Sequence, residues 1–201
     1  MSVRRLHDNQ PDSFAFTPEN MDWAATQIAK YPEGRQASAV LPLLWQAQKQ
    51  GGGWLSEPAI RCVADMLDMP YMRALEVATF YSMFNLSPVG KYFVQLCGTT
   101  PCWLRGADDL KAVCRRQIGE PGDISDDDKL SWIEVECLGA CVNAPMVQIN
   151  DDFYEDLTAD TFERLLEDLR HGRNVMTGPQ NGRQASAPEG GPTVLKLSLI
   201  H

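Results

Sequence analysis

The sequence has few histidines, no long apolar run and no excess of basic residues. Its three histidines, His7, His171 and His201, lie far along the chain from the cysteines, which disfavours a mixed Cys/His zinc site. No apolar run approaches the ~20 residues needed to cross a bilayer, so we expect no direct membrane insertion. The net charge is −9 and no basic stripe is present. We therefore expect no binding to nucleic acid through its phosphates.

The sequence also lacks the signature of a nucleotide-binding fold. No G-x-G-x-x-G follows a predicted strand, and the glycines at 51–53 are typical of a turn between helices. We expect the chain to bind neither NADH nor FMN by itself and to contain no substrate site. Residues 1–16 carry two arginines without an apolar segment behind them. They are interpreted as an N-terminal extension rather than a secretory or twin-arginine signal.

Four of the six cysteines form two loop pairs. Cys97 and Cys102 are spaced C-x4-C, and Cys137 and Cys141 are spaced C-x3-C. We expect a reducing compartment, where paired cysteines indicate metal ligation rather than structural disulfides. Four thiolates are the usual ligands of a [2Fe–2S] cluster, but they can also hold one tetrahedral zinc. The spacing favours the cluster, because zinc ribbons and thioredoxin-type dithiols prefer C-x2-C; zinc and unligated thiols remain open.

Residues 17–87 are predicted to form a helical domain. Four helices are expected to begin near Thr17, Ser38, Ser56 and Pro70, where capping residues or prolines precede apolar residues at helical spacing. The inward faces of the third and fourth helices are expected to include Ile60, Val63, Ala64, Leu67, Leu75, Val77, Phe80 and Phe84. The pattern is typical of a small helical bundle or hairpin array.

Residues 88–172 are predicted to form an α/β domain over a small mixed sheet. The expected order is a strand at 91–96, a helix at 105–118, strands at 132–136, 146–149 and 153–156, and a helix that Thr158 caps and Gly172 ends. Both cysteine pairs follow a strand. Two parallel neighbouring strands would therefore bring the pairs together at the sheet edge where ligands bind. Residues 173–201 are expected to form an extended tail that orders only on a partner.

Other residues near the cysteines are assigned roles by their type. Gly98 and Gly139 allow positive φ and are expected to let backbone N–H groups point at the sulfurs. Trp103 is expected to shield the site from water. Arg105 is interpreted either as a positive charge near the site or as a solvated surface residue.

The remaining cysteines and aromatic residues are interpreted mainly as packing residues. Cys62 and Cys114 lie at apolar positions of helical patterns and are expected to be buried small hydrophobes. Five aromatic residues of the helical domain either face a partner or pack in the core, and core packing is favoured for most: Trp45, Trp54, Phe80, Tyr81 and Phe84.

The segments around the cysteines resemble a known family. CGTTPC-x-LRGA, followed by VECLGAC-x-NAP-MVQIND-x-x-YEDL, is similar in motif order and spacing to the small [2Fe–2S] subunit of respiratory complex I. The segments YPEGRQASAVLPLLWQAQ, GGGWL, EVATFYSMF and PVGKY resemble the N-terminal domain of that family, so the resemblance covers about residues 15–175. One departure is the loop ISDDDKLSW, which lacks the glycine of a T-x-D-G that many members carry. That loop supplies no ligand, so only its local geometry is in question.

The resemblance implies a fold, a cofactor and a site. The fold is a thioredoxin-like [2Fe–2S] ferredoxin domain preceded by a small all-α helical domain. One [2Fe–2S] cluster is implied, and its ligands are Cys97, Cys102, Cys137 and Cys141. Pro145 lies where thioredoxin-like folds carry a cis-proline, so we predict a cis Ala144–Pro145 bond.

The resemblance also implies a role within an enzyme. The chain is expected to be the electron-transfer subunit of the NADH-dehydrogenase module of complex I, an NADH:quinone oxidoreductase. Its cluster would exchange single electrons with the FMN of a partner flavoprotein subunit, which also binds NADH. A large iron–sulfur subunit is the other implied partner. The expected location is a peripheral arm on the cytoplasmic side of the inner (plasma) membrane, of bacterial type rather than in the mitochondrial matrix.

Two alternatives remain open from the sequence. One is the equivalent ferredoxin subunit of an NAD-linked hydrogenase or formate dehydrogenase. The other, which the spacing favours less, is a zinc-stabilised interaction module without a redox role.

Overall fold

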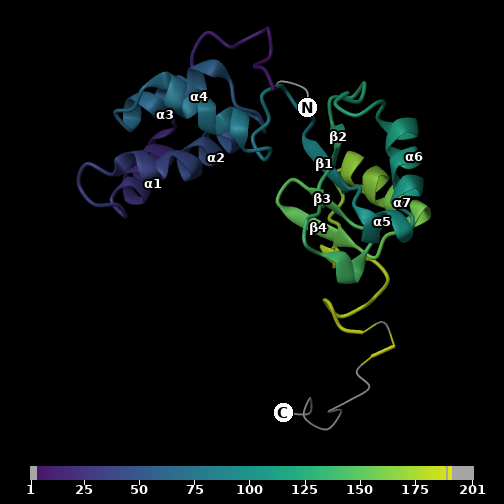
Figure 1. The fold of residues 1–201 in the computed structure, drawn as a ribbon. Coiled ribbons are helices and arrows are strands. Elements are labelled where there is room, and N and C mark those ends of the chain that lie inside the picture. Colours follow the sequence, from purple (N-terminus) through teal and green to yellow (C-terminus); the bar gives the residue numbers. More distant parts are fainter. Residues whose placement is uncertain (1–3, 189, 192–201) are drawn as a thin grey trace. The chain divides into compact units, whose positions relative to one another are not determined.

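The computed structural model describes residues 4–188, 190 and 191, so His201 and the end of the tail lie outside the described residues. Contacts divide the chain into two compact units, Met1–Val89 and Gly90–His201. The first is helical and the second is built on a sheet (Figure 1). Each unit has its own cluster of buried apolar residues. Within the described residues, no helix combines the length and apolarity that crossing a membrane requires.

The helical unit contains the four helices that the sequence predicts. They are α1 (Pro18–Ile28), α2 (Val40–Gln50), α3 (Glu57–Met66) and α4 (Tyr71–Phe80), with a 3-10 turn, η1 (Gln36–Ala39), before α2. The Thr17 side chain accepts from the N–H of Asn20, and the Ser56 side chain accepts from that of Ala59. These bonds satisfy backbone donors that the first turn of a helix leaves unpaired, which is why α1 and α3 begin where they do.

The core of the helical unit confirms the predicted face of α3 and corrects that of α4. The four α3 residues expected inward are all buried: Ile60, Val63, Ala64 and Leu67. Phe84 is buried too, but Phe80 is 78% exposed, so its predicted inward position is wrong. Ala74 and Ala78 are the fully buried residues of α4. These small side chains let α4 pack closely on α3. With Ala74 and Ala78 facing inward, Phe80, the last residue of the helix, faces outward.

Residues 4–16 pack against the helical unit. The Arg4 guanidinium donates to four carbonyls at and beyond the end of α4, including those of Tyr81 and Phe84. The N–H of His7 donates to the carbonyl of Leu86 at 2.9 Å, and Phe16 is buried in the core. The extension therefore caps the C-terminal end of α4, where a cation is favourable.

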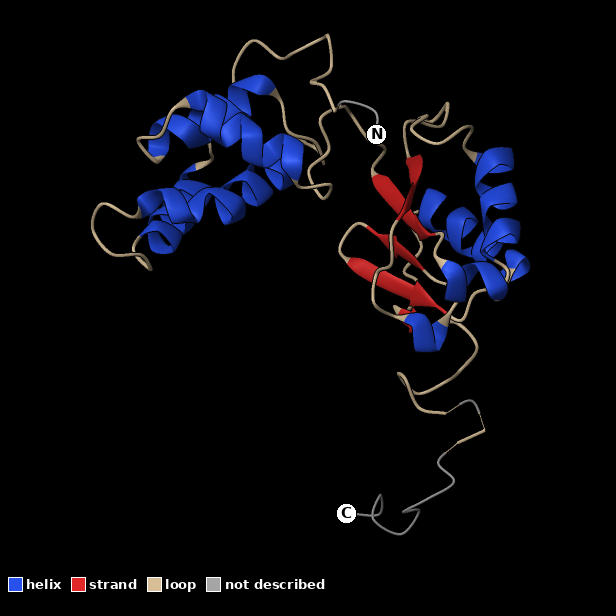
Figure 2. Cartoon of the chain, viewed as in Figure 1, coloured by secondary structure: helices blue, strands red, loops and turns tan. Residues whose placement is uncertain are grey.

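The second unit is an α/β domain over a mixed sheet, as predicted. Its strands are β1 (Tyr92–Cys97), β2 (Leu130–Val135), β3 (Val147–Ile149), β4 (Asp152–Glu155) and β5 (Gly178–Pro179), in the order β2-β1-β3-β4-β5. The β1–β2 and β4–β5 pairs are parallel, and the β1–β3 and β3–β4 pairs are antiparallel. Figure 2 shows this sheet in red, with helices in blue beside it.

Among the described residues of the second unit, the α-helices are α5 (Thr100–Leu104), α6 (Ala107–Gln117) and α7 (Ala159–Arg170). The sequence predicts one helix over 105–118, but Gly106 takes a φ of +103° and separates α5 from α6. Thr158 caps α7 as predicted, and the inward residues of α7 are buried. Helices α6 and α7 contact each other and lie on one face of the sheet (Figure 1).

Candidate metal centre

The parallel pairing of β1 with β2 brings the two cysteine loops together, as the sequence predicts. Cys97 is the last residue of β1 and pairs with Val135 of β2, two residues before Cys137. Cys102 lies in α5, directly after the first loop. Cys141 is the first residue of a 3-10 turn, η2 (Cys141–Asn143). All four cysteines therefore lie at the C-terminal ends of two neighbouring parallel strands, the usual ligand edge of an α/β sheet.

The first pair is buried in the core of the second unit. Cys97 and Cys102 are both inaccessible to solvent, and the Thr99 hydroxyl lies 3.3 Å from the Cys97 sulfur. Burial opposes ionisation of Cys97, but hydrogen bonds from Thr99 and from the Leu138 N–H outweigh it and lower the pKa of Cys97. Burial raises the pKa of Cys102 to about 12, and its hydrogen bond to Cys97 adds to this effect. The surroundings of the two sulfurs therefore shift their pKa values in opposite directions.

The second pair is exposed. The sulfurs of Cys137 and Cys141 are 3.4 Å apart, and the Gly139 N–H donates to the Cys137 sulfur at 3.4 Å. The hydrogen bond with Cys137 raises the pKa of Cys141. The predicted backbone N–H···S bond and the positive φ of Gly139 (+85°) are both confirmed.

The two pairs belong to one electrostatic site. The charge of Cys97 raises the pKa of Cys141, and the charge of Cys141 raises that of Cys102. The Leu138 N–H, from the second loop, stabilises the Cys97 thiolate of the first. Among the described residues, no group of three or more His, Cys, Asp or Glu is gathered as a site for one metal ion.

The donor set fits a [2Fe–2S] cluster. Such a cluster divides its four thiolate ligands between two irons, and the sulfurs here are arranged as two pairs. Binding of the cluster would require all four cysteines to lose their protons, because thiolates and not thiols are metal ligands. The backbone N–H groups of Thr99, Leu138, Gly139 and Met146 donate to these sulfurs. Such bonds stabilise negative charge on the ligands and tune the potential of a cluster that they hold.

Gly98 has a different role from the one expected. Its φ is not positive, and its N–H donates to the carbonyl of Val135 at 3.2 Å. A Cβ at this position would lie 1.8 Å from the Glu134 carboxylate. Glu134 in turn pairs with Lys111 at 2.8 Å. Gly98 therefore permits the close approach of the Glu134 side chain from β2, and its backbone conformation does not call for glycine.

The structure shows the contacts of Trp103 and Arg105, which follow Cys102, and the conformation of the bond before Pro145. Trp103 is exposed and its indole N–H donates to Asp108 at 2.9 Å, so the shielding role predicted for it stays a prediction. The Arg105 Nε donates to the carbonyl of Ala144 at 3.4 Å, which ties α5 to the second cysteine loop. The predicted cis bond between Ala144 and Pro145 is confirmed.

Sequence reasoning missed a polar network behind the second cysteine loop. Its members are Asn143, Asp156 and Arg183, all largely buried. Gly178 and Pro179 form β5 beside β4, and Arg183 forms an ion pair with Asp156 at 3.2 Å. That the tail orders only on a partner stays a prediction. The available signals were a glycine-rich GPQNGR segment containing one arginine and an aspartate directly after a strand.

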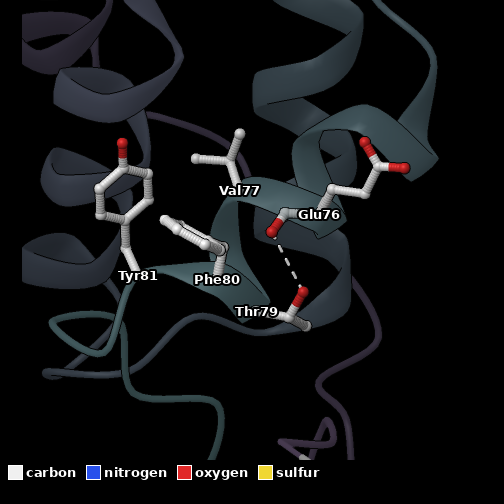
Figure 3. A pocket seen from close by; sticks show the side chains of 5 residues that line it. All are labelled: Glu76, Val77, Thr79, Phe80 and Tyr81. Atoms are coloured by element: carbon white, nitrogen blue, oxygen red, sulfur yellow. Dashed lines mark hydrogen bonds between the residues drawn. The ribbon is translucent and has the colours of Figure 1, made fainter.

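The helical unit carries a separate apolar pocket of about 450 Å³. It is lined by Glu76, Val77, Thr79, Phe80 and Tyr81, at the end of α4 (Figure 3). Figure 3 shows the side chains of Val77, Phe80 and Tyr81 turned to the same side, while Thr79 donates to the Glu76 carbonyl at 3.1 Å. None of the four paired cysteines lines this pocket.

Comparison with known proteins agrees with the geometry of the site. The chain is 54% identical to an NADH-quinone oxidoreductase subunit of Rhizobium meliloti (strain 1021), over 98% of this chain and 73% of that protein. It is 57% identical to the corresponding NADH-quinone oxidoreductase subunit of Rickettsia bellii (strain RML369-C), over 79% of this chain and 96% of that protein.

A solved structure supports the fold alone. The crystal structure of NAD+-reducing [NiFe]-hydrogenase in the air-oxidized state matches with a TM-score of 0.55 and 22% identity. The match covers 64% of this chain and 23% of that one.

The family model for thioredoxin-like [2Fe–2S] ferredoxins matches residues 24–170. This match confirms the fold predicted from the resemblance, and it confirms the [2Fe–2S] cluster rather than zinc as the cofactor. The chain therefore belongs to the thioredoxin-like [2Fe–2S] ferredoxin family.

Proposed function

We propose that this chain is the electron-transfer subunit of the NADH-dehydrogenase module of respiratory complex I. The observation that carries the proposal is the convergence of two cysteine pairs at the ends of the parallel strands β1 and β2. The relatives from Rhizobium meliloti and Rickettsia bellii are both subunits of NADH-quinone oxidoreductase, which supports this parent complex.

Cys97, Cys102, Cys137 and Cys141 are the proposed ligands of one [2Fe–2S] cluster. When bound, the cluster supplies one-electron exchange, here with the FMN of a partner flavoprotein subunit that also binds NADH. The chain positions the ligands, excludes water from Cys97 and Cys102, and donates backbone N–H groups to the sulfurs. The exposed second pair leaves one side of the site open for a partner to approach.

The proposed assembly also contains a large iron–sulfur subunit. The proposed location is the peripheral arm on the cytoplasmic side of a bacterial inner membrane. The likeness to the hydrogenase concerns the fold only, at 22% identity. Affinity purification of the tagged chain from its host decides the parent complex: we expect an FMN-binding flavoprotein of an NADH dehydrogenase to co-purify. Hydrogenase or formate dehydrogenase subunits in its place would contradict the assignment.

The cluster is tested on the full chain expressed with iron and sulfide. We expect a red-brown protein with visible absorbance and equal amounts of iron and acid-labile sulfide, two of each per chain. Serine at any one of the four paired cysteines should remove most of the visible absorbance. Cys62→Ser is the matched control, because Cys62 lies in α3 of the other unit, and should retain it. A colourless wild-type protein containing one zinc would refute the proposal.

A further inference from the structure

Residues 178–185 form a segment that we name the C-terminal clasp. It adds the short strand β5 to the sheet, where Gly178 pairs with Tyr154 of β4. The N–H of Gln180 then donates to the carbonyl of Glu155 at 2.9 Å. These bonds deliver Arg183 to the neighbourhood of η2, the turn that begins with Cys141.

Arg183 joins two parts of the site through its guanidinium group. Its Nη2 lies 3.2 Å from a carboxylate oxygen of Asp156, and its Nη1 donates to the carbonyl of Val142 at 2.9 Å. The side chains of Arg183 and Asp156 are only 9% and 3% exposed. Because both charges are largely buried, each needs the other, and their positions are coupled.

Asn143 connects the same network to η2 from the other side. Its side-chain N–H group donates to the second Asp156 oxygen at 3.1 Å and to the Ala185 carbonyl at 2.9 Å. Its backbone carbonyl accepts from the N–H of Asp156 at 2.8 Å. The two residues that follow Cys141 are thus both fixed by bonds to the clasp or to Asp156.

The exposed cysteine pair depends on such anchoring. Cys137 and Cys141 are exposed, and so is Val142, whereas Cys97 and Cys102 are embedded in the core of the unit. Apolar packing surrounds the first pair directly, whereas in the second loop only Leu138 and Ala140, between the two cysteines, pack against the core. Hydrogen bonds to η2 therefore contribute more to the position of the Cys141 sulfur than to that of Cys97 or Cys102.

We propose that Arg183 is a positioning residue for the metal centre, and that the C-terminal clasp is a working part of the site. The inference rests on the proposed role of Cys141 as a ligand. Groups that orient a ligand affect metal affinity about 10–100-fold when they are removed. A guanidinium is suited to this role because it donates in two fixed directions, whereas an ammonium is a single point charge.

The experiment compares R183A, R183K and D156N with the full-length wild type. R173A is the matched control, because Arg173 precedes the clasp and pairs with the exposed Asp168. The first readout is the rate at which a chelator bleaches the visible absorbance of the loaded protein. We expect bleaching about tenfold faster in R183A, a smaller increase in R183K and D156N, and none in R173A.

Two further readouts separate positioning from general stability. The electron paramagnetic resonance spectrum of the reduced protein should change in R183A and stay unchanged in R173A. In the cluster-free protein, the amide of Asn143 donates to the carbonyl of Ala140 at 2.9 Å and reports on η2. Its hydrogen exchange should accelerate in R183A, while the amides of β1 keep the wild-type rate.

The outcomes distinguish this inference from the proposed function. A wild-type chain that takes up no cluster overturns the proposed function and this inference with it. The inference alone is overturned if the wild-type chain takes up the cluster and R183A and R183K match it in bleaching rate, electron paramagnetic resonance spectrum and hydrogen exchange. If R183A does not fold, R183K and D156N are judged by the same three readouts, and wild-type behaviour in both overturns the inference.

Discussion

Asp128→Gly is expected to stabilise the second unit. Asp128 lies in the loop between α6 and β2 and takes a φ of +56°. Its hydrogen bonds within the described structure come from its backbone: the N–H donates to Ser125 at 2.8 Å, and the carbonyl accepts from Lys91 at 3.3 Å. Glycine preserves both bonds.

The expected gain follows from two opposing effects. A left-handed backbone costs an L-residue about 1–2 kcal/mol, of which a short polar side chain recovers part. The greater freedom of glycine in the unfolded chain costs about 0.5–1 kcal/mol. The free energy of unfolding should therefore rise by up to about 1 kcal/mol, and the melting temperature of the unit by up to roughly 6 °C.

Asn150→Gly is the matched control, because Asn150 has a similar φ of +54°. Its side chain accepts from the N–H of Phe93 at 2.9 Å and donates to the carbonyl of Lys91 at 3.1 Å. Losing two hydrogen bonds costs about 2 kcal/mol, so we expect a net loss of about 1 kcal/mol. Native-state hydrogen exchange of β1 and β2 amides measures both variants in the full chain. The reasoning fails if D128G is no more stable than wild type, or if both variants shift in the same direction.

Three further predictions concern the site and its supports. Gly98→Ala should destabilise the chain by about 1 kcal/mol, because the new Cβ would force Glu134 into another rotamer and break its ion pair with Lys111. In an E134A background the same substitution should have no such effect. Equal effects in both backgrounds would contradict the close-contact explanation. In the cluster-free protein at pH 8, an alkylating agent should modify the exposed Cys137 and spare Cys114. Burial raises the pKa of Cys114 to about 12 and keeps it a thiol. Mass spectrometry that finds both cysteines labelled equally fast would argue against this. Thr158→Ala should lower the free energy of unfolding by about 1 kcal/mol through loss of the α7 cap, measured by urea denaturation, and an unchanged midpoint would contradict it.

Local patterns along the chain predicted most of the fold. Capping residues located the starts of α1, α3 and α7, and strand residues running into Cys97 and toward Cys137 located β1 and β2. The convergence of the cysteine pairs followed from the order of strands and helices, because parallel neighbours end at the same edge. These features depend on a few adjacent residues, which is why they can be read without the structure.

Features that depend on distant contacts could not be read in this way. Gly98 is needed because a side chain from β2 lies over it, and nothing near Gly98 in the sequence indicates that approach. The predicted inward position of Phe80 is wrong because Ala74 and Ala78 give little signal against it in the sequence, although close helix packing selects them. Leu75 and Val77 do pack against the core. The pairing of Asp156 with Arg183 spans β4, α7 and the clasp, so composition alone suggested an unattached tail.

The separate cores of the two units have a consequence for damage to the protein. Buried residues of the helical unit form one cluster, and those around Cys97 and Cys102 form another. Oxidative destruction of the metal centre would remove support from the second cluster while leaving the first intact. The α1–α4 bundle can then keep its fold after the redox function is lost, so a damaged chain would still present a folded surface to whatever partner recognises that bundle.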